Sequence, residues 1–109
     1  MTIQVDNLFA NLPELSESEQ SLSLFENGSI KIQRTVSESY SNPAGFWYDQ
    51  AEDEWVMVVR GEATLEFEGG ELVRMQEGDY LTIPRHVKHR VQRTGPKTIW
   101  LAVHVRCEK

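Results

Sequence analysis

The residues best suited to chemistry lie in two separate stretches of this sequence. The first stretch contains Tyr48, Gln50 and Glu54, and the second contains His86 and His89. Side chains two apart on a strand point to the same face, so Tyr48 and Gln50 would share one. Glu54 is either an exposed member of an acidic loop or an inward carboxylate, and an inward charge needs a partner. His89 is either a hydrogen-bonded core histidine or a neutral ligand that a second hydrogen bond holds in place.

Two histidines outside this core set could also take part in chemistry. His86 follows Pro84 in a turn, where an imidazole can act as an acid or a base near neutral pH. His104 alternates with Trp100 along the last apolar run, and the residues on the alternate positions are Ile99, Leu101, Val103 and Val105. Because those residues predict the core face, we expect His104 to point away from it, at the surface or at a subunit contact.

Short strands would have to position these residues. Residues 21–33 alternate apolar and polar side chains around Asn27 and Gly28, a dipeptide that suits a type I′ hairpin turn. Further strands are indicated at 54–67, 72–75, 80–83, 89–93 and 98–105. About eight short strands without helical patterns between them are typical of an all-β sandwich or closed barrel. We expect one barrel domain over 21–109, preceded by an N-terminal arm over 1–20 that ends in a solvated stretch at 16–19.

The spacing of several residues resembles that of the cupin superfamily over roughly 45–105. Glu54 is followed by six residues and then Gly61, as in the second half of the first cupin motif. Gly78 is followed by five residues, then Pro84 and, after four more, His89, as in the second motif. The resemblance implies an antiparallel cupin (jelly-roll) β-barrel, which would bring the two motifs to one interior point.

The resemblance also implies a metal site. Cupins bind a divalent first-row metal through imidazoles and a carboxylate, a donor set that suits iron, manganese, nickel, copper or zinc. In this chain Glu54 and His89 would be metal ligands, and Gln50 would be a third ligand or a substrate contact. Tyr48 and His86 would be catalytic groups that donate or accept protons. The ligand set differs from the family pattern, because the two motif histidines fall on Tyr48 and Gln50.

Three functions are open at this point. The first is a metal-dependent cupin acting on a small oxygenated or anionic molecule, with the metal as a Lewis acid or oxygen activator. The second is a metal-free binding module, such as a ligand sensor or an accessory subunit, that uses the same pocket without catalysis. The third is a metal-independent sugar isomerase or epimerase, with His86 or His89 as the base and Tyr48 as the acid.

The composition argues against several classes of partner. The chain has 109 residues, a formal net charge of −6 and a pI near 5.0, whereas a nucleic-acid-binding domain normally has a basic face. Its one basic cluster, at 85–93, is better explained as a counter-charge for an acidic group or an anionic small ligand. No apolar run approaches the ~20 residues that span a membrane, and no signal peptide is recognisable. With Cys107 as its single cysteine the chain forms no internal disulfide, and we expect a cytoplasmic protein.

The placement of the tryptophans predicts a homodimer. Trp55 and Trp100 alternate away from the expected interior of the barrel, and a chain of this size rarely leaves two such rings in water. Packing of one sheet against that of a second copy would cover them. The N-terminal arm is the alternative cover.

Overall fold

The computed structural model describes residues 1–106, which form eight strands and no helix. The strands are β1 (Ser18–Glu26), β2 (Ile30–Glu38), β3 (Glu52–Arg60), β4 (Glu62–Phe67), β5 (Leu72–Gln76), β6 (Tyr80–Ile83), β7 (His89–Thr94) and β8 (Thr98–Arg106). β1 begins within the segment expected as an arm, so the barrel includes the last residues of that segment. In this part of the chain, nothing has the length and apolar character of a membrane-spanning helix. Cys107 lies outside the described residues.

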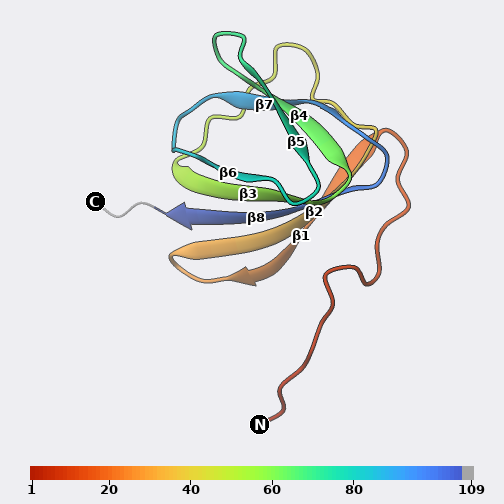
Figure 1. Ribbon diagram of the computed structural model, residues 1–109. Coiled ribbons are helices and arrows are strands. Elements are labelled where there is room, and N and C mark those ends of the chain that lie inside the picture. The colour runs from red at the N-terminus through yellow and green to blue at the C-terminus, as the bar shows by residue number, and fades with distance from the viewer. Residues whose placement is uncertain (107–109) are drawn as a thin grey trace.

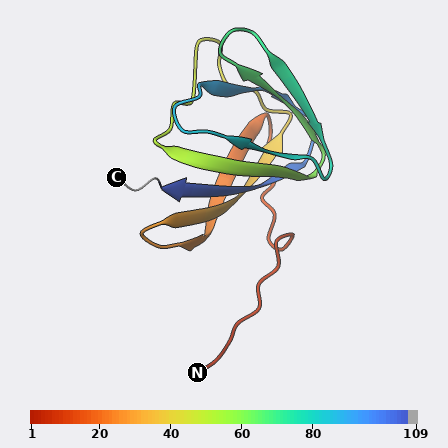
Figure 2. The same ribbon diagram turned by 60° about the vertical axis from the view of Figure 1, so that its left-hand side comes forward.

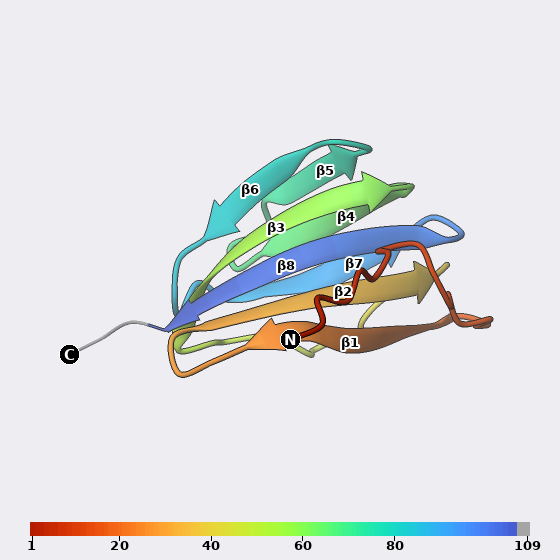
Figure 3. The ribbon, with the colours of Figure 1, turned by 90° about the horizontal axis from the view of Figure 1, so that it is seen from below.

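The strands form two antiparallel sheets that face each other (Figure 1). The larger sheet has the order β1-β2-β8-β3-β6 and the smaller sheet has the order β5-β4-β7. Figure 3 shows the larger sheet in front, with β4, β5 and β7 behind it. The predicted all-β, antiparallel jelly-roll barrel is therefore confirmed, and its interior lies between the two sheets.

The β1–β2 hairpin turns at the dipeptide that predicts it. The side-chain Oδ1 of Asn27 accepts hydrogen bonds from the backbone N–H groups of Ser29 and Ile30, at 2.8 and 2.9 Å. The N–H of Asn27 donates to the carbonyl of Ile30 at 2.9 Å. An asparagine side chain that satisfies the turn's own N–H groups is a common reason for this residue to begin a hairpin turn.

Gly61 allows the chain to pass from the larger sheet to the smaller one. It joins β3 to β4 with a φ of +89°, in the region that favours glycine. A Cβ atom at this position would lie 2.6 Å from Oγ1 of Thr98 and 2.9 Å from its Cα. The close approach to the first residue of β8 therefore requires a glycine, and it closes this end of the barrel.

The interior positions of β8 differ from those expected. The core cluster consists of Val56, Val58, Ala63, Leu65, Met75, Ile83, Val91, Trp100 and Ala102. Trp100 and His104 are 5% and 7% exposed and both line the barrel interior, so the expectation that they face away from it is wrong. Ile99, on the other face, is only 2% exposed. β8 lies between β2 and β3 in the larger sheet, and in a strand covered on both faces hydrophobic alternation does not reveal the inner face.

The segment before β1 crosses the outer face of the larger sheet. The buried Arg34 donates two hydrogen bonds from Nη1, to the carbonyl oxygens of Leu8 and Ala10, at 3.0 and 2.9 Å. The Arg60 guanidinium lies 4.1 Å from the centre of the Phe9 ring, which is a cation–π contact. The residues before Leu8 extend away from the barrel (Figure 2).

Candidate functional site

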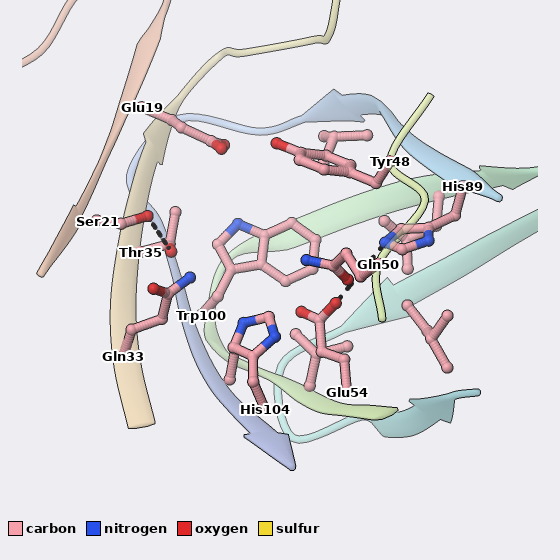
Figure 4. A pocket seen from close by; sticks show the side chains of 15 residues that line it. Glu19, Ser21, Gln33, Thr35, Tyr48, Gln50, Glu54, His89, Trp100 and His104 are labelled. Atoms are coloured by element: carbon pink, nitrogen blue, oxygen red, sulfur yellow. Dashed lines mark hydrogen bonds and ion pairs between the residues drawn. The ribbon is translucent and has the colours of Figure 1, made fainter. Parts of the chain in front are cut away.

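A cavity of about 110 Å³ lies inside the barrel, between the two sheets (Figure 4). Polar side chains reach it from β1, β2, β3, β7, β8 and the loop that precedes β3. Four of the residues singled out from the sequence meet here, namely Tyr48, Gln50, Glu54 and His89. The interior point that the two cupin motifs predict is therefore a cavity with hydrogen-bonding walls.

Glu54 and His89 form a buried pair at one side of this cavity. Oε1 of Glu54 lies 3.7 Å from Nε2 of His89, and the two side chains are 13% and 6% exposed. Nδ1 of His89 lies 2.9 Å from the carbonyl oxygen of Val87. A carbonyl oxygen can only accept, so Nδ1 carries a proton and Nε2 faces the carboxylate.

The Glu54–His89 pair favours one shared proton. With Nδ1 protonated, a neutral His89 would direct the lone pair of Nε2 at a carboxylate, whereas a proton on Nε2 makes the contact attractive. Burial lowers the pKa of His89, but the contacts with Glu54 and with the carbonyl of Val87 outweigh it, and the pKa is raised above 6.5. The pair can therefore hold a proton to a higher pH than an isolated imidazole would.

Tyr48 and Gln50 both face the cavity, as their spacing predicts. The backbone of Tyr48 exchanges two hydrogen bonds with that of His89, at 2.7 and 3.2 Å. Their rings stack with centroids 5.4 Å apart. Burial raises the pKa of Tyr48 above 10.0, and the negative charge of Glu19 raises it further. Tyr48 is thus a neutral hydroxyl at physiological pH, able to donate a hydrogen bond.

His86 does not line the cavity. Its side chain is 64% exposed, and its Nδ1 lies 2.8 Å from Oδ1 of Asp49. Its φ of +63° lies in the left-handed region that favours glycine. The N–H of His86 donates to the carbonyl of Gln50 at 2.7 Å. The geometry therefore gives His86 a part in holding the loop that carries Gln50, and it supports His89 in place of His86 as the base.

Glu19 is a cavity residue that the sequence did not reveal. It projects from β1, which pairs Glu19 with Ser37 on β2, and it accepts a hydrogen bond of 2.9 Å from Oγ of Ser37. That hydroxyl in turn accepts one of 3.1 Å from Nε1 of Trp100. Burial raises the pKa of Glu19 above 4.5, although the Ser37 hydrogen bond opposes this. The expectation of a solvated stretch at 16–19 is wrong for Glu19. Hydrophobic alternation could not have found it, because Glu19 shares the inner face of β1 with Ser21, whereas Leu22 on the other face is 51% exposed.

His104 is the second cavity residue that sequence reasoning misplaced. It is the cross-strand partner of Glu54 in the β3–β8 pair, so both side chains share the inner face. Its Nδ1 is buried without a hydrogen bond and lies 3.7 Å from Oε1 of Glu52. A buried imidazole without a hydrogen bond is costly, and the cavity beside it offers room for a ligand that could supply one.

The donors in the cavity do not fit a resident metal ion. The carboxylate of Glu54 and the imidazole of His89 are strong ligands, and the amide oxygen of Gln50 is a weak one. Across residues 1–106, no three His, Cys, Asp or Glu side chains are grouped closely enough to hold one ion. Catalytic sites for these metals generally use three protein ligands, so a metal held by this set would have the weak amide oxygen of Gln50 as its third ligand.

The basic cluster serves as a counter-charge to acidic residues of β4. Arg90 lies 2.7 Å from Glu66, and Arg93 lies 3.7 Å from Glu62. These four side chains lie on neighbouring strands, since β7 pairs with β4. The first of the two explanations offered by the sequence, a counter-charge for acidic groups, is thus the one the structure supports.

Comparison with solved structures gives many similar barrels. A proposed mannose-6-phosphate isomerase from Ralstonia eutropha JMP134 is 42% identical, with a TM-score of 0.89, and the match covers 96% of this chain and 100% of that one. A conserved protein from Streptococcus pyogenes matches with 17% identity and a TM-score of 0.79, over 100% of this chain and 92% of that one. A cupin superfamily protein from Desulfitobacterium hafniense DCB-2 matches with 17% identity and a TM-score of 0.78, over 98% and 95%. The latter two show the fold alone.

Comparison with protein families agrees with the fold of these barrels. Comparison with curated proteins gives no significant match. The family model described as the Cupin domain matches residues 44–104. This range contains both motifs, the Glu54–His89 pair and the cavity residues of β8. With more than half of its length matched by that model, the chain belongs to the cupin domain family.

Proposed function

We propose that this protein is a metal-independent isomerase or epimerase that moves a proton on a small sugar-like molecule held in the barrel. The observation that carries the proposal is the Glu54–His89 pair, which faces a cavity lined with hydrogen-bonding side chains. Burial and a specific charge partner perturb the pKa of His89, and such groups in a cavity are candidates for proton transfer.

The chemistry can be assigned to the residues around the pair. Neutral His89 would remove a proton from the hydroxyl-bearing carbon next to a carbonyl, which gives an enediolate, while the Glu54 carboxylate stabilises the imidazolium that forms. In an isomerase the imidazolium would return the proton to the former carbonyl carbon, while the hydroxyl proton passes to the former carbonyl oxygen. In an epimerase the imidazolium would keep its proton, and Tyr48 as the second acid would deliver its own proton to the opposite face of the same carbon. Tyr48 and the amide of Gln50 can donate hydrogen bonds to the oxygen on which negative charge develops.

The 42% identical relative supports the reaction class. It covers almost the whole chain and is described as a proposed isomerase of a sugar phosphate. An isomerase that works through enolisation requires a base and hydrogen-bond donors but no metal, which agrees with a cavity that does not fit one.

Isotope exchange tests the proposal. The wild-type protein is incubated in D₂O with a panel of aldoses and ketoses, and NMR follows deuterium incorporation next to the carbonyl carbon. We expect exchange with at least one sugar, reduced by about 100-fold or more in Glu54→Gln and in His89→Asn. The exposed Glu71→Gln variant is the control and should keep the wild-type rate.

Two outcomes would lead to the alternative functions. Sugar binding without exchange would overturn the proposed catalysis and leave a binding module. Elemental analysis of untagged protein should give well under one metal ion per chain. A stoichiometric metal that is lost in the Glu54→Gln, His89→Ala double variant would instead restore the metal-dependent function and place Glu54 and His89 in the ligand set.

A further inference from the structure

Apart from the histidines, the charged side chains that line the cavity are all negative. None of the lining residues in the described part of the chain is a lysine or an arginine. The lining includes two carboxylates, Glu19 and Glu54, which lie on opposite sides with the Trp100 ring between them (Figure 4). His89 can neutralise Glu54, but Glu19 has only the Ser37 hydroxyl as a hydrogen-bond partner. The cavity therefore has a negative potential.

The nearest arginines on the neighbouring strands are held elsewhere. Arg34 of β2 points to the outer face, where it binds the carbonyl oxygens of the arm. Arg90 of β7 lies 2.7 Å from Glu66 and also donates to the carbonyl of Asn42 at 2.7 Å. Each of these groups would have to break two hydrogen bonds to enter the cavity, so neither is available for an anionic ligand.

The rest of the lining suits hydroxyl groups. Gln33 offers an amide from β2, and the hydroxyls of Ser21 and Thr35 lie 2.7 Å apart, each able to donate or accept. The His104 side chain, 8% exposed, has a buried Nδ1 without a hydrogen bond. Trp100 is fixed by its hydrogen bond to Ser37, and its flat face is a surface on which the C–H groups of a ring can pack.

We infer that the ligand is an uncharged, polyhydroxylated molecule of about one sugar ring in size, and that the cavity rejects the phosphate ester of the same sugar. This inference rests on the proposed function, for which it names the substrate class. Hydroxyls can donate to Glu19 and accept from Gln33, whereas a phosphate dianion would face the Glu19 carboxylate, and the imidazole of His89 is already paired with Glu54. A site that binds phosphate normally offers an arginine, a lysine or a helix N-terminus.

The inference departs from what the description of the Ralstonia eutropha relative suggests. That protein is described as a proposed isomerase of a 6-phosphate. The present cavity has the polar groups for the sugar but not those for the phosphate. The kind of reaction and the preference for a phosphate group are therefore two separate properties. A binding measurement can test the preference for phosphate by itself.

The test compares neutral hexoses and pentoses with their terminal phosphates. Saturation-transfer NMR detects binding of each sugar to the wild-type protein, and isothermal titration calorimetry measures the affinities. We expect at least one neutral sugar to bind about tenfold or more tightly than its phosphate. In Glu19→Gln the preference for the neutral sugar should fall by several-fold, because the carboxylate that repels phosphate is gone. Glu71→Gln, with the same change of charge on an exposed loop, should keep the wild-type preference.

The outcomes separate this inference from the proposed function. A phosphate that binds as tightly as its parent sugar, or a panel in which no neutral sugar binds, would overturn it. An unchanged preference in Glu19→Gln would overturn it too, because the discrimination would not come from the cavity charge. Neutral sugars that bind with the expected preference but show no isotope exchange would support this inference and reject the catalysis.

Discussion

At the scale of single residues, the cavity holds two groups whose pKa values are raised for different reasons. Burial raises that of Glu19, which has a hydroxyl for a partner and no cation. Contact with an anion raises that of His89, against the effect of its burial. A raised carboxyl pKa destabilises the fold at neutral pH, whereas a raised imidazole pKa stabilises it wherever the imidazole is charged. Glu19 and His89 therefore predict opposite effects of mutation.

Replacing Glu19 with Gln should stabilise the protein at neutral pH. The amide oxygen can still accept from Ser37 while the buried charge is removed, so we expect the free energy of unfolding at pH 7 to rise by about 0.5 to 1 kcal/mol. The penalty in wild type is absent below pH 4.5, where the carboxyl is protonated in both states, and grows as pH rises through the folded pKa. Urea unfolding of both proteins across this range measures it. A variant that is less stable than wild type at pH 7 would show that Glu19 has a compensating partner.

Removing the carboxylate partner of His89 should destabilise the protein, whereas Glu19→Gln should stabilise it. In both cases the difference in unfolding free energy from wild type should become more positive as pH rises. The folded state binds the imidazole proton more tightly than the unfolded state, so the stabilisation is complete below pH 6.5 and is lost as pH rises through the folded pKa. Glu54→Gln should therefore be less stable than wild type at pH 6, by about 1 kcal/mol. The two proteins should converge above the folded pKa. Chemical unfolding at a series of pH values provides the check, and a difference that grows with pH would contradict the shared proton.

At the scale of elements, local sequence predicts where the strands lie more readily than it predicts which face of each strand points into the barrel. The Asn27 turn and Gly61 mark where strands end, because each satisfies a local backbone requirement. Tyr48, Gln50, Glu54 and His89 could be placed in one cavity because the motif spacing fixes their strands. Trp100 and His104 could not, since the more apolar residues of β8 lie on its outer face, where Ile99 is buried. Glu19 was missed because its strand begins earlier than the alternation alone indicated.

The β3–β4 connection provides a prediction at this scale. Gly61→Ala would place a methyl group within 3 Å of Thr98, in addition to the strain of a positive φ, and should cost about 2 to 4 kcal/mol of stability. Gly69→Ala is the matched control, because its φ is +102° but no atom lies within 4 Å of the added Cβ. That control should cost about 1 kcal/mol. Equal losses of thermal stability in the two variants would mean that strain alone, and not the contact with β8, requires the glycine.

At the scale of the whole molecule, apolar groups remain uncovered on the outer face of the larger sheet and in the arm. On the outer face of the larger sheet, Trp55 packs against Tyr80 with centroids 5.5 Å apart, and Tyr80 is 65% exposed. Ile3 and Val5, in the part of the arm that extends away from the barrel (Figure 2), are 78% and 90% exposed. The arm covers the outer face only around Arg34 and Arg60. A second copy of the chain, packed on this face and reached by the arm, would cover both places.

The homodimer expected from the sequence stays a prediction, with a changed contact. Trp100 is inside the barrel and has no part in the contact, which leaves Trp55 as the residue to test. Trp55→Glu would put an unpaired charge into an apolar interface and should convert a dimer to a monomer at micromolar concentration, as measured by light scattering. Leu72→Glu is the control, because Leu72 is 57% exposed on the smaller sheet, and it should leave the dimer intact. A wild-type protein that is monomeric at this concentration would contradict the prediction. A dimer that survives Trp55→Glu but dissociates in Leu72→Glu would move the contact to the smaller sheet, beside the strands that carry Leu65 and His89 into the cavity.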